Sequence, residues 1–229
     1  MVLLAALAVA AAPPPAAPSC ASYRPTAATA YAAVARRPLR AYRQPGRAPI
    51  AAFRRWNVNG VRTVFGVLEA AHGAGCRPTW LRVHLPMRPN GSAGWVRARD
   101  VALRKVSARI VVDLSARSVT LFRDGAEVFA TRSAIGSPAT PTPTGSYYVN
   151  QKLVPDDPRG PYGVGAIGIS AFSPVLKNWP QGGPVAIHGT NQPWLIGRRI
   201  SNGCIRVTNA AIRRLWRDAP PGTPVVIHR

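Results

Sequence analysis

The chain has 229 residues, 47% of them hydrophobic, and a formal net charge of +22 from 30 Lys and Arg against 8 Asp and Glu. This hydrophobic fraction suffices to bury a core and excludes an intrinsically disordered chain, and the length fits one large domain or two small ones. So few carboxylates leave little room for an acidic metal site. No like-charge tail is present, so the charge does not indicate a nucleic-acid-binding arm.

Residues 1–33 are predicted to form a signal-like segment and an Ala/Pro linker. Residues 1–23 carry no charge, residues 2–12 form a short apolar run, and prolines and small residues follow. This order is typical of an export signal, although the usual cation before the apolar run is missing. We therefore expect export, with the segment either cleaved or retained as a membrane anchor. A low-complexity tail is the alternative.

Residues 34–104 are predicted to form a small all-β domain. Turn signals recur at 44–46, 59–60, 73–75 and 89–91, with short apolar runs between them. Such spacing favours a small β-barrel. The stretches 80–86 and 94–96 resemble the bacterial SH3-like domains that precede cell-wall enzymes.

Residues 105–229 are predicted to form a second, mostly β domain. Asp124-Gly125 is a hairpin turn signal, and a single helix is expected after Thr208-Asn209 because apolar residues then recur at helical spacing up to the breaker at 220–222. The expected strands are 110–114, 119–123, 126–131 and 225–227.

The three cysteines are expected to have different roles. Export would allow Cys20 and Cys76 to pair, and the sequence alone does not decide whether they do. Cys204 is then the odd thiol. No two cysteines lie at metal-ligand spacing and the four histidines are scattered, so no zinc site is predicted.

Two segments carry the candidate chemistry, residues 187–190 (Ile-His-Gly-Thr) and 201–207 (Ser-Asn-Gly-Cys-Ile-Arg-Val). A free thiol is mostly protonated at neutral pH, so a nucleophilic Cys204 needs a nearby base, and His188 is a fitting partner. Gly203 permits a tight turn and a close approach of substrate. A Cys/His pair alone is a weak signal, and a buried structural cysteine with a core histidine is the alternative.

The wider pattern over residues 108–228 resembles the catalytic domain of the L,D-transpeptidase family of peptidoglycan enzymes. The matching pieces occur in the family's order, and they are the strand 110–114, the hairpin 121–125, the Thr/Pro/Gly segment 140–149, the two segments above, Ile196-Gly197 between them, and the closing strand 222–227. The resemblance implies a β-sandwich-like catalytic domain preceded by the SH3-like β-barrel.

The resemblance also implies the roles of the site residues. Cys204 would attack a peptide carbonyl and form a thioester, and His188 would take the thiol proton and pass it to the leaving amine. The Gly189 carbonyl would orient the histidine, and the N–H groups of Gly203 and Cys204 would form the oxyanion hole.

Three neighbouring residues complete the predicted site. Ser201 would shape the turn, and Asn202 stands where many family members carry a second histidine, which leaves His188 as the base of the motif. Arg206 could hold a substrate carboxylate as a bidentate donor, or form a salt bridge inside the sheet.

The implied activity is that of an exported cell-wall enzyme without metal or cofactor. It would acylate Cys204 with a tetrapeptide stem, release D-Ala, and transfer the acyl group to an amine to form 3→3 cross-links. Carbapenem-type β-lactams would be covalent inhibitors, and anionic wall polymers rather than nucleic acid would be attracted by the charge. An L,D-carboxypeptidase and a non-catalytic wall-binding module are the alternatives.

Other polar and aromatic residues have weaker signals. Arg198-Arg199 could attract an acidic stem peptide, although a solvated loop is the simpler interpretation. Tyr162 and Trp194 could line the cleft or belong to the core, and Asp156-Asp157 is interpreted as a turn.

Overall fold

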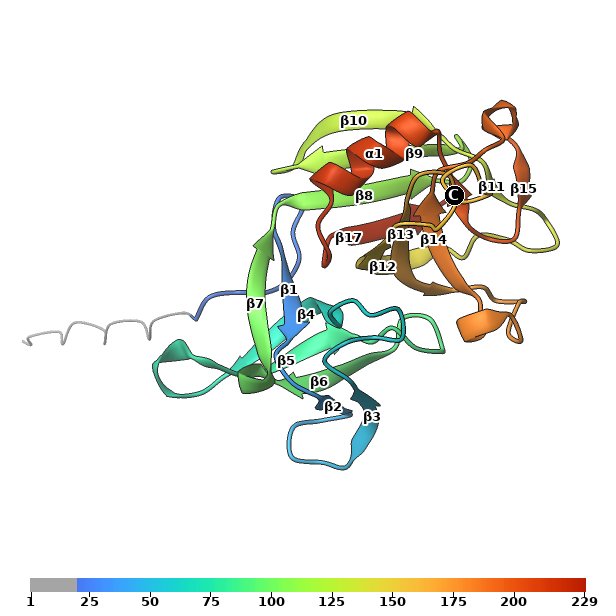
Figure 1. The fold of residues 1–229 in the computed structure, drawn as a ribbon. Helices are drawn as coiled ribbons and strands as arrows, with labels where there is room; N and C mark the ends of the chain where they lie inside the picture. Colours follow the sequence, from blue (N-terminus) through green and yellow to red (C-terminus); the bar gives the residue numbers. More distant parts are fainter. Residues whose placement is uncertain (1–19) are drawn as a thin grey trace, which may run out of the picture.

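A computed structural model of the chain describes residues 20–229 and shows two large β-sheets, the N-terminal one below the other in Figure 1. The predicted export signal lies outside the described residues, apart from its last few positions. None of the helices in the described range is long and apolar enough to cross a membrane. The mostly β class expected from the sequence is confirmed.

The N-terminal sheet has the strand order β3-β2-β6-β5-β4-β1-β7. The four predicted turn regions each separate consecutive strands, and the domain's SH3-like character stays a prediction. The strands are β1 (Ala30–Ala35), β2 (Leu39–Tyr42), β3 (Pro49–Phe53), β4 (Val64–His72), β5 (Pro78–His84), β6 (Ala93–Arg97) and β7 (Val101–Val106), with short 3-10 helices at Ala74–Cys76 and Ala98–Asp100.

Two strands extend across the predicted boundaries of this domain, and the division into domains stays a prediction. Strand β1 begins at Ala30, so residues 30–33 belong to the sheet and not to a linker. Strand β7 continues to Val106, beyond the expected boundary at 104. The start of β1 was not recognised in the sequence because alanines occur equally in linkers and in strands packed close to a neighbour.

The second sheet has the order β10-β9-β8-β17-β12-β13-β14-β16, and β11 and β15 form a separate parallel pair. The strands are β8 (Ala108–Asp113), β9 (Ser118–Arg123), β10 (Ala126–Arg132), β11 (Ile135–Gly136), β12 (Gly145–Leu153), β13 (Ala166–Phe172), β14 (Pro184–His188), β15 (Arg199–Ser201), β16 (Ile205–Arg206) and β17 (Pro224–His228), with 3-10 helices at Pro180–Gly182 and Pro193–Leu195.

Local sequence signals explain the edge of this sheet. Asp124 and Gly125 have φ values of 51° and 86°, the left-handed conformation that a two-residue hairpin turn requires at both positions. The three predicted strands therefore form the antiparallel run β8-β9-β10. Strand β17 then joins β8 in parallel, so the sheet is mixed.

The helix α1 (Asn209–Asp218) lies against the second sheet (Figure 1). The Thr208 hydroxyl accepts a hydrogen bond from the Ala211 N–H at 3.2 Å, which caps the helix start. Ile212 and Leu215 are buried in the core of this domain. The predicted helix is confirmed at both ends, with Thr208 rather than Asn209 as the cap.

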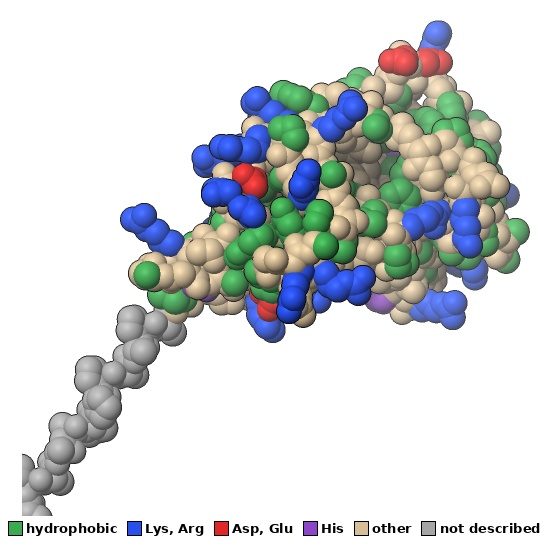
Figure 2. Space-filling model, turned by 90° about the horizontal axis from the view of Figure 1, so that it is seen from below, with side chains coloured by type: hydrophobic (Ala, Val, Ile, Leu, Met, Phe, Trp, Pro, Cys, Tyr) green, Lys and Arg blue, Asp and Glu red, His purple; other side chains and the backbone are tan. Residues whose placement is uncertain are grey.

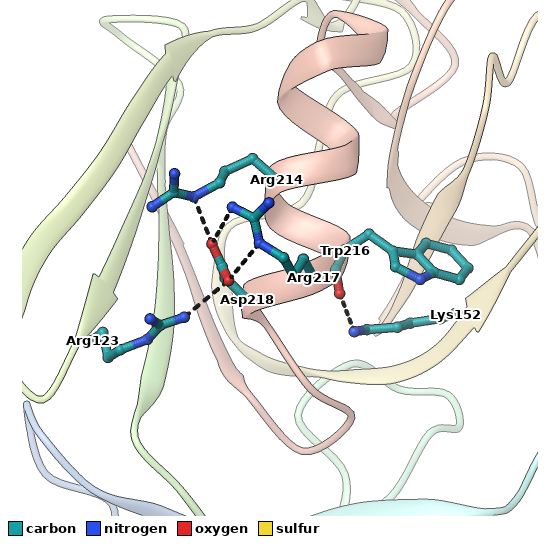
Figure 3. A network of polar contacts seen from close by, with 6 residues as sticks. All are labelled: Arg123, Lys152, Arg214, Trp216, Arg217 and Asp218. Carbon is teal, nitrogen blue, oxygen red and sulfur yellow. Dashed lines mark hydrogen bonds and ion pairs between the residues drawn. The ribbon is translucent and has the colours of Figure 1, made fainter.

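The C-terminal end of α1 is fixed by the polar contacts drawn in Figure 3. Asp218 forms ion pairs with Arg214 and Arg217 of the helix and, at 3.0 Å, with Arg123 of β9. A carboxylate is unfavourable at a helix C-terminus, and the three guanidinium groups offset that charge. On the other side, the Lys152 ammonium of β12 donates to the Trp216 carbonyl.

The core of the second domain extends to the N-terminal sheet, which also has a core of its own. Ala30, Ala32 and Val64 of the N-terminal sheet are buried in the same cluster as the second domain. The buried Tyr148 of β12 donates a hydrogen bond from its hydroxyl to the Val64 carbonyl at 3.0 Å. A Cβ atom added to Gly66 would lie 3.0 Å from the Tyr148 ring, so glycine permits this close approach.

Cys20 and Cys76 form a disulfide, which resolves the pairing that the sequence left open. The bond ties the first described residue to the loop between β4 and β5. Cys204 is the free thiol.

Candidate active site

Strand register brings His188 and Cys204 together. Strands β14 and β16 pair in parallel, with Ile187 opposite Ile205 and His188 opposite Arg206. Because successive side chains of a strand alternate between faces, Ile187 and Ile205 enter the core while His188, Cys204 and Arg206 share the other face. The two motif segments therefore meet on one face of the sheet.

These residues line a cavity of about 240 Å³. Its walls include five of the predicted site residues and the aromatic side chains of Tyr162 and Trp179. The five are His188, Ser201, Asn202, Cys204 and Arg206. A cavity of this kind, mostly apolar with a few convergent polar groups, is the usual form of a small-substrate site.

His188 is held as a neutral imidazole. It is 2% exposed, and its Nδ1 donates to the Gly189 carbonyl at 2.6 Å. Burial lowers the pKa of His188 to about 4, the Gly189 hydrogen bond partly opposes this, and the Arg206 charge lowers it further. With the proton on Nδ1, the lone pair of Nε2 is available to accept a proton.

Cys204 is held as a thiol. Burial raises its pKa, while a hydrogen bond with the Ala186 backbone and the charge of Arg206 act in the opposite direction. A neutral thiol beside a neutral imidazole is not a resting ion pair. A nucleophilic role for this thiol would require transfer of its proton to a base such as His188.

The turn before Cys204 depends on Gly203 and Ser201. Gly203 has a φ of 109°, a conformation that residues with a Cβ rarely adopt. The Ser201 hydroxyl donates to the Cys204 carbonyl at 2.5 Å and accepts from the Gly203 N–H at 3.2 Å. Thr140, from the Thr/Pro/Gly segment, donates to the Ser201 carbonyl at 2.9 Å. This segment thus supports the turn from outside.

The same contacts bear on the predicted oxyanion hole. The Gly203 N–H is engaged by Ser201 in this structure. An oxyanion would have to replace that hydrogen bond or rest on the Cys204 N–H. The assignment of both groups to an oxyanion hole stays a prediction.

Arg206 has no partner for its charge in the described part of the chain. Within residues 20–229 no carboxylate forms an ion pair with it, and its buried Nε lacks a hydrogen-bond partner. The structure therefore does not contain the internal salt bridge that was one of the two interpretations. An unpaired guanidinium that lines the cavity is suited to bind a carboxylate group.

The residues with weaker sequence signals divide into those that line the cavity and those that do not. Tyr162 lines the cavity beside His188, whereas Trp194 is 68% exposed and belongs neither to the cavity nor to the core. Arg198 and Arg199 are exposed, in agreement with solvated side chains, but Arg199 begins strand β15 and does not lie in a loop. The Asp157 carboxylate accepts from the Arg159 N–H, as expected of a turn.

Asn209 is a positioning residue that the sequence did not reveal. Its Oδ1 accepts hydrogen bonds from the N–H groups of Val164 at 3.3 Å and Thr190 at 3.2 Å. A Cβ added to Gly189 would lie 2.3 Å from this oxygen. Asn209 therefore fixes the loop after His188 to the loop that carries Tyr162. An asparagine just after a helix cap gave no signal of this.

A second cavity of about 480 Å³ reaches Cys204 from another side. Tyr162, Trp179 and Pro184 line both cavities. The sequence did not predict Trp179, because no spacing marks a loop aromatic as part of a cleft. The sulfur thus lies where two openings meet.

A family model described as the L,D-transpeptidase catalytic domain (YkuD) matches residues 107–227. A putative L,D-transpeptidase YkuD from Bacillus subtilis is 32% identical over 120 residues, which cover 52% of this chain and 65% of that protein. The chain thus spans less than two thirds of the length of this relative.

Solved structures of L,D-transpeptidases have a lower sequence identity to this chain. An L,D-transpeptidase from Mycobacterium smegmatis is 17% identical, with a TM-score of 0.43 over 73% of this chain and 91% of that one. An LD transpeptidase in complex with imipenem is 16% identical, with a TM-score of 0.42 over 65% of this chain and 90% of that one. The assignment rests on the family model, which matches more than half of the chain. This chain belongs to the family of L,D-transpeptidase catalytic domains.

Proposed function

We propose that this protein is an exported L,D-transpeptidase that cross-links peptidoglycan. The observation that carries the proposal is the cavity in which the Cys204 thiol, a neutral His188 and an unpaired Arg206 share one face of adjacent strands. A nucleophile, a base and an anion-binding group are the parts that acyl transfer from an acidic peptide needs.

The first half-reaction forms a thioester. The Cys204 sulfur attacks the carbonyl carbon of the third stem residue, and His188 Nε2 takes the thiol proton. Collapse of the tetrahedral intermediate breaks the peptide bond, and His188 returns the proton to the leaving D-Ala amine. Arg206 would hold a carboxylate of the stem peptide during this step.

The second half-reaction transfers the acyl group. A neutral acceptor amine of another stem attacks the thioester and loses a proton to His188, and Cys204 regains its thiol, giving a 3→3 cross-link. Water in place of the amine would make the protein an L,D-carboxypeptidase. The near-complete burial of His188 limits water at the base and supports transfer to an amine.

Export and wall attachment are part of the proposal. The Cys20–Cys76 disulfide supports an oxidising compartment, since such bonds persist mainly in exported proteins. Lys and Arg side chains are spread over the face seen in Figure 2, and Asp and Glu are few there. With a net charge of +22, such a surface would attract anionic wall polymers in a salt-dependent manner.

The decisive experiment is incubation with a disaccharide-tetrapeptide, followed by mass spectrometry. We expect loss of D-Ala and formation of a tetrapeptide–tripeptide dimer, neither of which occurs with Cys204→Ala. A tripeptide monomer as the sole product would replace transpeptidation by hydrolysis. Equal turnover by Cys204→Ala would refute the mechanism.

A carbapenem tests the nucleophile independently of the natural substrate. Its strained amide can acylate a reactive thiol, so the intact protein should gain the mass of one carbapenem. Cys204→Ala should gain none. Absence of an adduct on the wild-type protein would leave the non-catalytic wall-binding alternative.

A further inference from the structure

A third cavity, of about 490 Å³, lies between the two domains. One wall comes from the N-terminal domain, with Phe53 and Trp56 at or just after β3. The other wall comes from the second domain, with Asn150 and Gln151 of β12 and Phe172 of β13. The predicted domains thus form this cavity jointly, and the catalytic chemistry described above does not use it.

The interdomain cavity adjoins the second cavity, which reaches Cys204. Asn59, Gln151, Gln181 and Pro184 line both spaces. The side chains at this junction are ordered by amide hydrogen bonds, from Asn59 Nδ2 to Gln151 Oε1 at 3.0 Å and from Gln181 Nε2 to Asn59 Oδ1 at 3.1 Å. A ligand joined covalently to a peptide at Cys204 could therefore extend into it.

The chemistry of the walls points to an uncharged polar ligand with an apolar face. Arg54 is the single charged residue among the lining residues. The Oδ1 atom of Asn150 is buried and has no hydrogen-bond partner in the described part of the chain, so it lacks a donor. Trp56 is 49% exposed and gives an apolar wall beside these amides. N-acetylated sugars combine N–H and O–H donors with an apolar ring face.

We propose that the interdomain cavity binds an N-acetylated sugar of the glycan strand that carries the stem peptide. This inference rests on the proposed function. The glycan is attached to the first stem residue, so an extended peptide acylated at its third residue places the sugar roughly 10 Å from Cys204. An acetamido N–H would satisfy Asn150, and a sugar ring would pack against Trp56.

The test is calorimetric titration of the full-length Cys204→Ala variant with tri-N-acetylchitotriose, a probe without peptide. We expect saturable binding that Asn150→Ala and Trp56→Ala each weaken at least tenfold. Asn150→Asp keeps an oxygen acceptor and should retain binding within about threefold. Asn191→Ala and Trp194→Ala are matched controls, because both residues are exposed and outside the three cavities, and they should bind like the parent. Thermal melting confirms that each variant is folded.

Three results would overturn the proposal. These are no binding to the parent, binding that folded Asn150→Ala and Trp56→Ala variants leave unchanged, and displacement of the probe by free tetrapeptide alone, which would assign the cavity to the stem. Acylation by a carbapenem needs no sugar. A protein that is acylated on Cys204 but does not bind the probe therefore refutes this inference and leaves the proposed function intact.

Discussion

The Tyr162 ring lies edge-on to the imidazole of His188, with ring centroids 4.9 Å apart and planes at 61°. Tyr162 belongs to the loop after β12, so this contact places a loop aromatic over the base. Since burial is the main cause of the lowered pKa of His188, the Tyr162 ring is part of what keeps the base neutral.

Removing the Tyr162 ring should therefore expose the His188 imidazole to solvent. Tyr162→Ala should raise the pKa of His188 toward 6.5 and destabilise the fold by about 1 kcal/mol, whereas Tyr162→Phe keeps the ring and should change neither quantity appreciably. Titration of the His188 ring proton by NMR measures the first effect, and urea unfolding the second. Equal pKa values in the three proteins would show that the ring does not shield His188.

The buried His188 also makes stability depend on pH. Its native pKa is about 4 and its unfolded pKa about 6.5, so between these values the unfolded chain binds a proton that the native protein does not. The free energy of unfolding should be highest above pH 6.5 and fall by roughly 3 kcal/mol as the pH drops to 4. His188→Gln should lack this component, which urea unfolding of both proteins at pH 7 and pH 4.5 would measure.

The same pKa sets the acid limit of the reaction. Since His188 stays neutral above about pH 4, the rate of carbapenem acylation should change by less than about twofold between pH 7 and pH 5.5. The rate should decline only as the pH approaches 4. A half-maximal rate near pH 6.5 in stopped-flow or mass measurements would contradict a buried, neutral base.

Removing the charge of Arg206 should weaken substrate binding and alter both pKa values. Arg206→Gln should raise KM for the tetrapeptide about 10- to 100-fold, the range of a lost charge-assisted hydrogen bond, and Arg206→Lys should lie between. The pKa values of His188 and Cys204 should both rise in Arg206→Gln, because the Arg206 charge lowers them. A loss of stability with KM unchanged would assign Arg206 a structural role instead.

Asn209 should be essential for the geometry of the site. Asn209→Ala leaves the N–H groups of Val164 and Thr190 without their acceptor, which should cost about 1–3 kcal/mol and slow acylation. Asn209→Asp keeps the acceptor at a helix N-terminus, where a negative charge is favourable, and should preserve both properties. Chemical unfolding and carbapenem labelling of the two variants provide the comparison.

Local signals predicted much of the second domain. Asp124-Gly125 sets the hairpin, and the apolar spacing after Thr208 sets α1, because both depend on neighbouring residues. The parallel pairings of β17 with β8 and of β14 with β16 join distant segments, and no local pattern specifies them. The association of the segments that contain β14 and β16 was inferred only from the family resemblance.

The site was predicted where it coincides with a motif and missed where it depends on packing. His188 and Cys204 stand in recognisable segments, and their shared cavity follows from strand register. Asn209 and Trp179 act through contacts that become visible only in the folded chain. The interdomain cavity forms only when both domains are folded and packed against each other, so no pattern within either half of the sequence could predict it.

The seam between the two sheets limits how the protein can be divided. Tyr148 is seated against Gly66, and a Cβ on Gly222 would lie 2.2 Å from that of Ala32. A fragment trimmed to residues 107–227 would uncover this face and leave the Tyr148 hydroxyl without Val64. In this chain the N-terminal module is therefore part of the folded structure of the enzyme and cannot be removed without exposing buried surface. Exchanging it between relatives would require a module with the same small residues at the seam.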